Sequence, residues 1–149
     1  MTTPRRLLPS LLRDPPLTLA AMLDHIGISV SDYARSKAFY EPVLATLGSS
    51  MQMEPAPHVS GWGPSPMEPS FWISAGCATQ DKPPIGPVHV AFTAKTRKAV
   101  DAFYEAAIKA GAKCNGKPGI RAEYHPNYYG AFVHDLDGHN IEAVCHMPE

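Results

Sequence analysis

Two histidines stand at matching positions of a stretch that occurs twice in the sequence. Residues 25–41 and 89–105 both begin with histidine and both end with Ala-Phe-Tyr-Glu, at a constant offset of 64 residues. A repeat of this length indicates one supersecondary unit used twice, so we expect His25 and His89 at equivalent places in a pseudo-symmetric fold. Imidazole and carboxylate groups are common ligands of divalent metals. With Glu142 near the C-terminal end of the chain, the two histidines form a candidate metal site.

Each of these ligands also has a structural alternative. A single histidine in a strand is more often a hydrogen-bonded surface or core residue than a metal ligand. Glu142 alone would be an ordinary solvent-facing carboxylate that pairs with a nearby lysine or arginine. Two histidines at matching repeat positions, together with a glutamate, favour the metal site over both alternatives.

A second group of hydrogen-bonding and aromatic side chains lies just before the last two strand-like segments. His125, Tyr128 and Tyr129 are candidate catalytic residues, because an imidazole and a phenol can exchange protons with a substrate. Asn127 is a candidate substrate-binding residue, with an amide that both donates and accepts hydrogen bonds. The alternative is a turn anchored by Pro126 and Asn127, with the tyrosines buried.

Two tryptophans are candidate walls for a flat or apolar substrate. Trp62 and Trp72, with Phe71 beside the second, have large apolar faces. Core packing is the alternative for at least one of these rings. His134 and His139 flank a turn sequence, and we expect both to be exposed.

The spacing of apolar residues predicts the strands and helices that carry these side chains. In 25–30 and 88–93, apolar residues alternate with histidine and small residues, which is typical of a half-buried strand. Each strand is followed by a helix signal, the second over 95–110.

The signals at the ends of the first helix are more specific. Ser31 or Asp32 is the expected N-cap, and Gly48 is the expected C-terminal stop. Pro42 predicts that this helix ends early or kinks, because proline removes a backbone donor.

Short strand-like segments follow each helix. The clearest one in the first unit is 70–75, and it is preceded by 61–66, a Gly- and Pro-rich stretch that we expect to be a loop without regular structure. In the second unit, 128–134 and 139–145 flank Asp-Leu-Asp-Gly, a hairpin signal with glycine where positive φ is tolerated. Each unit is therefore predicted to be βαβββ.

Composition limits the partners and the compartment. The 149 residues carry a formal net charge of −1, which gives no general attraction to nucleic acid or to an anionic membrane. No run approaches the roughly 18 apolar residues that a membrane span needs. The three cysteines form no CxxC motif and indicate free thiols in a reducing compartment. We expect a cytoplasmic protein with a small-molecule partner.

The first 21 residues differ from the rest of the chain. They contain four prolines and, in their first 13 positions, three arginines and no acid. This composition is compatible with a weak targeting segment, but the prolines interrupt any helix or apolar core of a signal. We expect residues 1–21 to be an irregular and dispensable extension, and Met22 is a candidate for the true start.

The repeated histidine openings and the closing Asp-Leu-Asp-Gly-His-Asn-Ile-Glu of 135–142 resemble the vicinal oxygen chelate superfamily, over residues 22 to 146. This superfamily includes glyoxalase I, extradiol dioxygenases, fosfomycin-resistance transferases and bleomycin-binding proteins. The resemblance implies an α+β fold in which two tandem βαβββ modules, 22–82 and 83–149, form a cupped, pseudo-symmetric mixed sheet with the helices outside. It also implies a divalent metal, and His25, His89 and Glu142 match three of its ligand positions.

The fourth ligand position departs from the glyoxalase I pattern. Trp72 aligns with the second metal-binding carboxylate of that isomerase, and an indole cannot bind the metal. Two histidines and one carboxylate with open coordination positions suit an Fe(II) dioxygenase or a Mn(II)-dependent transferase better. The expected cofactor is one divalent ion of Fe, Mn, Ni or Zn.

Two kinds of function follow from the resemblance. One is a metal-dependent glyoxalase-like or dioxygenase-like enzyme, a lyase, isomerase or dioxygenase acting on a small molecule with vicinal oxygens. The other is a non-catalytic protein that sequesters a small molecule, as the bleomycin-resistance members do. The resemblance also implies a possible homodimer, sometimes with sites built across the interface.

Overall fold

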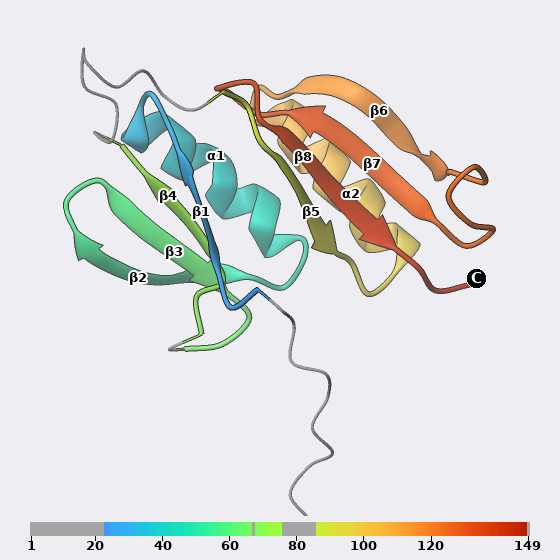
Figure 1. The fold of residues 1–149 in the computed structure, drawn as a ribbon, viewed down its shortest axis with the longest axis horizontal. Helices are drawn as coiled ribbons and strands as arrows, with labels where there is room; N and C mark the ends of the chain where they lie inside the picture. The colour runs from blue at the N-terminus through green and yellow to red at the C-terminus, as the bar shows by residue number, and fades with distance from the viewer. Residues whose placement is uncertain (1–22, 67, 76–85, 149) are drawn as a thin grey trace, which may run out of the picture.

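The chain folds into two βαβββ units, seen in a computed structural model that describes residues 23–66, 68–75 and 86–148. The first unit consists of β1 (Ile26–Ser29), α1 (Tyr33–Ala45), β2 (Ser50–Ala56), β3 (Val59–Gly63) and β4 (Phe71–Ser74). The second consists of β5 (His89–Thr93), α2 (Arg97–Lys109), β6 (Lys113–Ile120), β7 (Tyr129–His134) and β8 (Asn140–Cys145). Figure 1 shows the two units side by side. The α+β class with tandem βαβββ modules is confirmed.

Each unit has its own four-stranded mixed sheet. The strand orders are β1-β4-β3-β2 and β5-β8-β7-β6, with β1 parallel to β4, β5 parallel to β8 and the other pairs antiparallel. Within the described ranges, β1 and β5 do not pair, so the strands of one chain form two sheets and no continuous cup. The predicted module boundary at 82–83 and the predicted extension 1–21 lie outside the described residues.

The helix ends follow from capping residues. Asp32 is the N-cap of α1, where its carboxylate accepts the backbone N–H of Arg35 at 3.0 Å. Gly48, with φ of 77°, follows the C-terminal end of the helix as predicted. Pro42 does not end α1, which continues to Ala45. None of the helices in the described part of the chain has the length and apolar composition needed to cross a membrane.

The predicted loop at 61–66 is wrong for its first three residues. Gly61, Trp62 and Gly63 belong to β3, a central strand between β2 and β4. The ring of Trp72 on β4 lies so close to Gly61 that a Cβ there would approach it to 2.8 Å. These glycines therefore make room for neighbouring groups within the strand, which is a recognised role of glycine in sheets.

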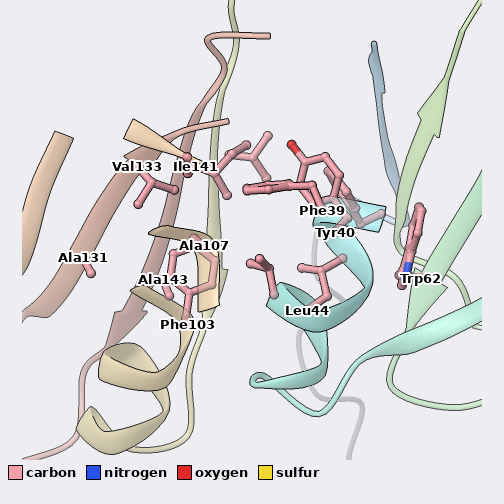
Figure 2. Close-up of a cluster of buried hydrophobic side chains, with 14 of the residues drawn as sticks. Phe39, Tyr40, Leu44, Trp62, Phe103, Ala107, Ala131, Val133, Ile141 and Ala143 are labelled. Atoms are coloured by element: carbon pink, nitrogen blue, oxygen red, sulfur yellow. The ribbon is translucent and has the colours of Figure 1, made fainter. Parts of the chain in front are cut away.

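One hydrophobic core joins the two units. Phe39, Tyr40 and Leu44 of α1 and Phe103 and Ala107 of α2 are buried in the same cluster, and α1 contacts α2. Figure 2 shows these side chains gathered around the two helices, with Trp62 of the first sheet on one side and Val133 and Ile141 of the second sheet on the other. Each sheet therefore packs one face against a helix, while no helix of the described residues covers its other face.

A buried polar junction also connects the units. Tyr40 on α1 donates its hydroxyl proton to Asp135, after β7, with an O···O distance of 2.5 Å. Two backbone N–H groups, those of Asp137 and His139, donate to the other carboxylate oxygen of Asp135 at 3.0 and 2.8 Å. The Ser31 hydroxyl and backbone N–H, just before α1, both donate to Asp137. The β7–β8 turn is thus bonded to the start of α1 through satisfied polar groups.

His139 belongs to this junction, and its predicted exposure is wrong. It is 5% exposed. Its Nδ1 accepts the Val88 backbone N–H at 3.2 Å, so the proton is on Nε2, which donates to the Ser29 carbonyl at 2.9 Å. The imidazole bridges the backbones of both units because the turn packs against the first unit.

Replacing Tyr40 by phenylalanine tests the junction. Burial, followed by the charge of Asp135, raises the pKa of Tyr40 well above its usual value. At neutral pH we expect Tyr40→Phe to lower the free energy of unfolding by about 1.5–3 kcal/mol, because a buried carboxylate loses a donor. Since the native pKa lies above the unfolded value of about 10, the stabilisation by Tyr40 is complete below pH 10 and is lost as the pH rises further. Urea titrations at several pH values should show a shallower alkaline loss of stability in the variant, and an unchanged loss would contradict this account.

Candidate functional site

A buried carboxylate lies on the helix-free face of the second sheet. Glu142 is 2% exposed, and it lies opposite Phe132 of β7 in the strand register. Its Oε2 is 3.1 Å from Nε2 of His89, and its Oε1 accepts the hydroxyl of Tyr128 at 2.5 Å. A Cβ on Gly130 would lie 3.2 Å from Oε1, so this glycine leaves space for the carboxylate. Glu142 is therefore buried in the sheet and bonded to the imidazole of His89 and the phenol of Tyr128.

Asparagine side chains hold the other side of His89. The amide nitrogen of Asn140 lies 2.5 Å from Nδ1 of His89, and Asn115 donates to the amide oxygen of Asn140 at 3.0 Å. In this orientation the His89 proton is on Nε2 and points to Glu142. The reversed amide would accept a proton from Nδ1 and leave the Nε2 lone pair free for a metal, the arrangement usual for ligating histidines.

A pair of histidines lies next to Tyr128. Nε2 of His125 is 2.8 Å from Nδ1 of His146, and the Asn127 backbone N–H donates to Nδ1 of His125 at 3.1 Å. His125 therefore carries its proton on Nε2 and donates to His146. The Tyr128 ring makes edge contacts with both imidazoles. The structure thus brings His125 and Tyr128 together with Glu142, while Asn127 contacts this group through its backbone.

Tyr128 and Tyr129 lie on opposite faces of the sheet. Burial, then the hydrogen bond to Glu142, raises the pKa of Tyr128 strongly, so its hydroxyl is a proton-bearing donor to this carboxylate. Tyr129 donates instead to Asp101 on α2 at 2.8 Å, with the guanidinium of Arg97 over its ring. Because neighbouring strand residues alternate in direction, Tyr129 is not brought to the Glu142 group.

The helix-free face of the first sheet carries His25 and Trp72. The side chain of His25 is 59% exposed, and its Nδ1 lies 2.7 Å from Asp24. His25 and the half-buried Trp72 line a hollow of about 570 Å³, together with Met53 and Pro69. Trp62 is fully buried and packs against core rings, which corrects its expected role as a substrate wall. Trp72 remains available to a ligand.

Among the described residues, no three His, Cys, Asp or Glu side chains come together in a way that could hold a metal ion. His89 and Glu142 meet on the second sheet, whereas His25 lies on the first. One carboxylate and one imidazole are suitable donors for a divalent metal, but they are two of the three expected. A single chain therefore supplies a fitting but incomplete donor set.

Four residues of this site were not predicted from the sequence. They are Asn115, Phe132, Asn140 and His146. Asn140 and His146 share the face of Glu142 because they lie two and four positions from it along an extended segment. Strand alternation counted outwards from Glu142 would have identified both, whereas Phe132 required the register between β7 and β8.

Comparisons with known proteins agree with this architecture. A family model described as the Glyoxalase/Bleomycin resistance protein/Dioxygenase superfamily matches residues 22–143. A glyoxalase/bleomycin resistance protein from Albidiferax ferrireducens T118 is similar in structure, with a TM-score of 0.72, 27% identity, and 84% of this chain and 99% of that chain covered. A putative glyoxalase from Bacillus halodurans has the same fold, with a TM-score of 0.63, 21% identity and coverage of 85% and 97%. No curated protein matches the sequence.

Removing the hydroxyl of Tyr128 tests how Glu142 is held. We expect Tyr128→Phe to lower the free energy of unfolding by about 1–3 kcal/mol, because the buried carboxylate loses its phenol donor. Tyr124→Phe is the matched control, since Tyr124 is 61% exposed, and its effect should stay within about 0.5 kcal/mol. Denaturant titration at neutral pH measures both. Equal effects of the two substitutions would mean that the Tyr128 bond does not stabilise the site.

Proposed function

The chain belongs to the glyoxalase/bleomycin resistance protein/dioxygenase superfamily, and from this premise we propose that it is a metal-dependent enzyme acting on a small molecule with vicinal oxygens. The observation that carries the proposal is the buried Glu142 carboxylate, shared by His89 and Tyr128 on a helix-free sheet face. Glutamate is rarely buried unless it is paired, and here its partners are an imidazole that can bind a metal and a phenol that can carry a proton.

The proposed ligands are His89 and Glu142 of one chain and His25 of a second copy. His25 and His89 begin equivalent segments of the repeat, and each belongs to the helix-free face of its own sheet. A twofold dimer in which the first sheet of one copy faces the second sheet of the other would complete two identical sites. The mostly exposed His25 ring supports this, because it is accessible to a partner chain.

The metal would polarise the neighbouring oxygens of the substrate, with open coordination positions to receive them. The other residues bind and orient. Asn140 sets the proton position of His89, and Tyr128 holds the Glu142 carboxylate in place. The His125–His146 pair can take up or release a proton at the edge of the site.

The reaction type is narrowed by Trp72. An indole stands where glyoxalase I would have a second carboxylate, so dioxygenase or transferase chemistry, or a lyase that needs one carboxylate, fits better than that isomerase. The metal is expected to be Fe, Mn, Ni or Zn. We expect the enzyme in the cytoplasm, consistent with free thiols at Cys114 and Cys145.

The second candidate is a non-catalytic protein that binds a small molecule. One observation favours it: His89 and Glu142 already satisfy each other by a direct contact of 3.1 Å, so this pair is stable without an ion. Trp72 on the first sheet or the rings near Tyr128 on the second would then hold a flat ligand. Dependence on metal separates the two candidates, and dependence of turnover on molecular oxygen separates a dioxygenase from a lyase.

The metal content of protein purified without a chelating tag tests the proposal. We expect about one equivalent of a transition metal per chain, as in other mononuclear sites. His89→Ala and Glu142→Gln should each lose it, since each removes a ligand. His134→Ala is the matched control and should keep the metal, because His134 is at the end of β7 outside the Glu142 group. Inductively coupled plasma mass spectrometry measures all four proteins. Wild-type protein that neither contains nor takes up divalent ions would favour the binding protein.

A further inference from the structure

We propose that Arg121 binds the carboxylate group of a small acidic molecule, in a hollow that adjoins His89 and Glu142. This inference rests on the proposed function in one respect, namely that the bound acid is the substrate of the proposed enzyme. The binding itself is argued from the position of Arg121.

The guanidinium of Arg121 is held in one position by its neighbours. It lies over the ring of Phe132, 5.5 Å from the centroid, and one of its N–H groups donates to the Lys117 carbonyl at 2.7 Å. Two glycines of β6 clear the space beneath it. A Cβ on Gly116 would lie 3.3 Å from one terminal nitrogen, and a Cβ on Gly119 would lie 3.1 Å from the other. A guanidinium fixed in this way loses little further conformational freedom when it binds an anion.

The positive charge of Arg121 has no counter-ion in the part of the chain that the structure describes. Its side chain is half-buried, and no carboxylate there comes within the 4.0 Å of an ion pair. Glu123 borders the same hollow as Arg121, but its carboxylate forms no ion pair with the guanidinium. Of the five N–H donors of Arg121, one donates to the Lys117 carbonyl at 2.7 Å and one makes a long contact of 3.5 Å with the Ile120 carbonyl. Arg121 therefore keeps donors for a planar bidentate partner.

The hollow leads from Arg121 to the candidate metal ligands. Its volume is about 310 Å³, and its lining includes Asn115, Tyr124, Phe132 and Asn140. Asn140 is bonded to His89, and the ring of Phe132 lies 6.4 Å from the imidazole of His89. A molecule anchored on Arg121 would therefore extend along Phe132 towards the His89 end of the site.

The charges around the hollow favour a carboxylate over a phosphate. Glu123 borders it, and the buried Glu142 lies opposite Phe132 in the neighbouring strand. These two carboxylates would repel a dianion more than a monoanion. The rings of Phe132 and Tyr124 add apolar walls, which suit an aromatic or aliphatic acid.

Benzoate is the probe, with benzamide as its neutral isostere. Binding to the full-length protein as purified is measured by ligand-observed NMR titration. We expect benzoate to bind and benzamide to bind at least about tenfold more weakly, because charge-assisted hydrogen bonds to Arg121 are lost. Arg121→Gln should weaken benzoate by a similar factor. Lys117→Gln removes the same charge four residues away, from an exposed side chain, and should change the affinity less than about twofold.

Further binding measurements test whether Arg121 holds the carboxylate. Glu123→Gln should strengthen benzoate binding, a result that does not depend on the folding of an Arg121 variant. Equal affinities for benzoate and benzamide, no binding of benzoate, or unchanged binding by Arg121→Gln would each overturn the assignment. Binding of inorganic phosphate through Arg121 without binding of benzoate would also overturn it. Metal content and uptake measured in parallel separate this test from the proposed function: a protein that neither contains nor takes up divalent ions, yet binds benzoate through Arg121, would refute the metal enzyme alone.

Discussion

The relative position of the two units depends on the buried hydrogen bond between Tyr40 and Asp135 and the groups that surround it. Asp135 accepts from Tyr40 of one unit and from backbone N–H groups of its own turn, while His139 bridges Val88 and Ser29. Buried polar groups of this kind stabilise one arrangement because any other would leave them unsatisfied. Together with the contact between α1 and α2, they keep the units packed on their helical sides.

This packing determines which sheet faces of each chain are open to a ligand. Both sheets keep a helix-free face, and each such face carries one histidine of the repeat. The second face also carries the buried Glu142 with Tyr128 and Asn140, so its half of the site is the more elaborate. The first face contributes His25 and the ring of Trp72 beside a hollow. A site that uses both histidines therefore requires faces from two copies of the chain.

Local features of the fold were predictable from the sequence, whereas long-range packing was not. Alternating apolar residues and caps such as Asp32 act over a few positions, so the strands, the helices and the place of Glu142 within the last strand could be inferred. The sequence around Gly61 and Gly63 is typical of a loop. The reason for glycine at these positions is close contact with Trp72 and Glu68, which exists only in the folded protein. The burial of His139 depends on Ser29, 110 residues away in the sequence, and periodicity contains no information on such a contact.

A site shared between two copies is most directly tested by mixing chains that each lack a different ligand. If the site is shared, His25→Ala and Glu142→Gln chains, purified separately, should each form homodimers without an intact site. After unfolding and refolding together in equal amounts, half of the dimers are mixed, and each mixed dimer has one complete set of His25, His89 and Glu142. The account predicts that the mixture recovers about a quarter of an equivalent of metal per chain, whereas neither variant refolded alone recovers any. A mixture that stays metal-free, beside wild-type protein that regains its metal under the same treatment, would contradict it.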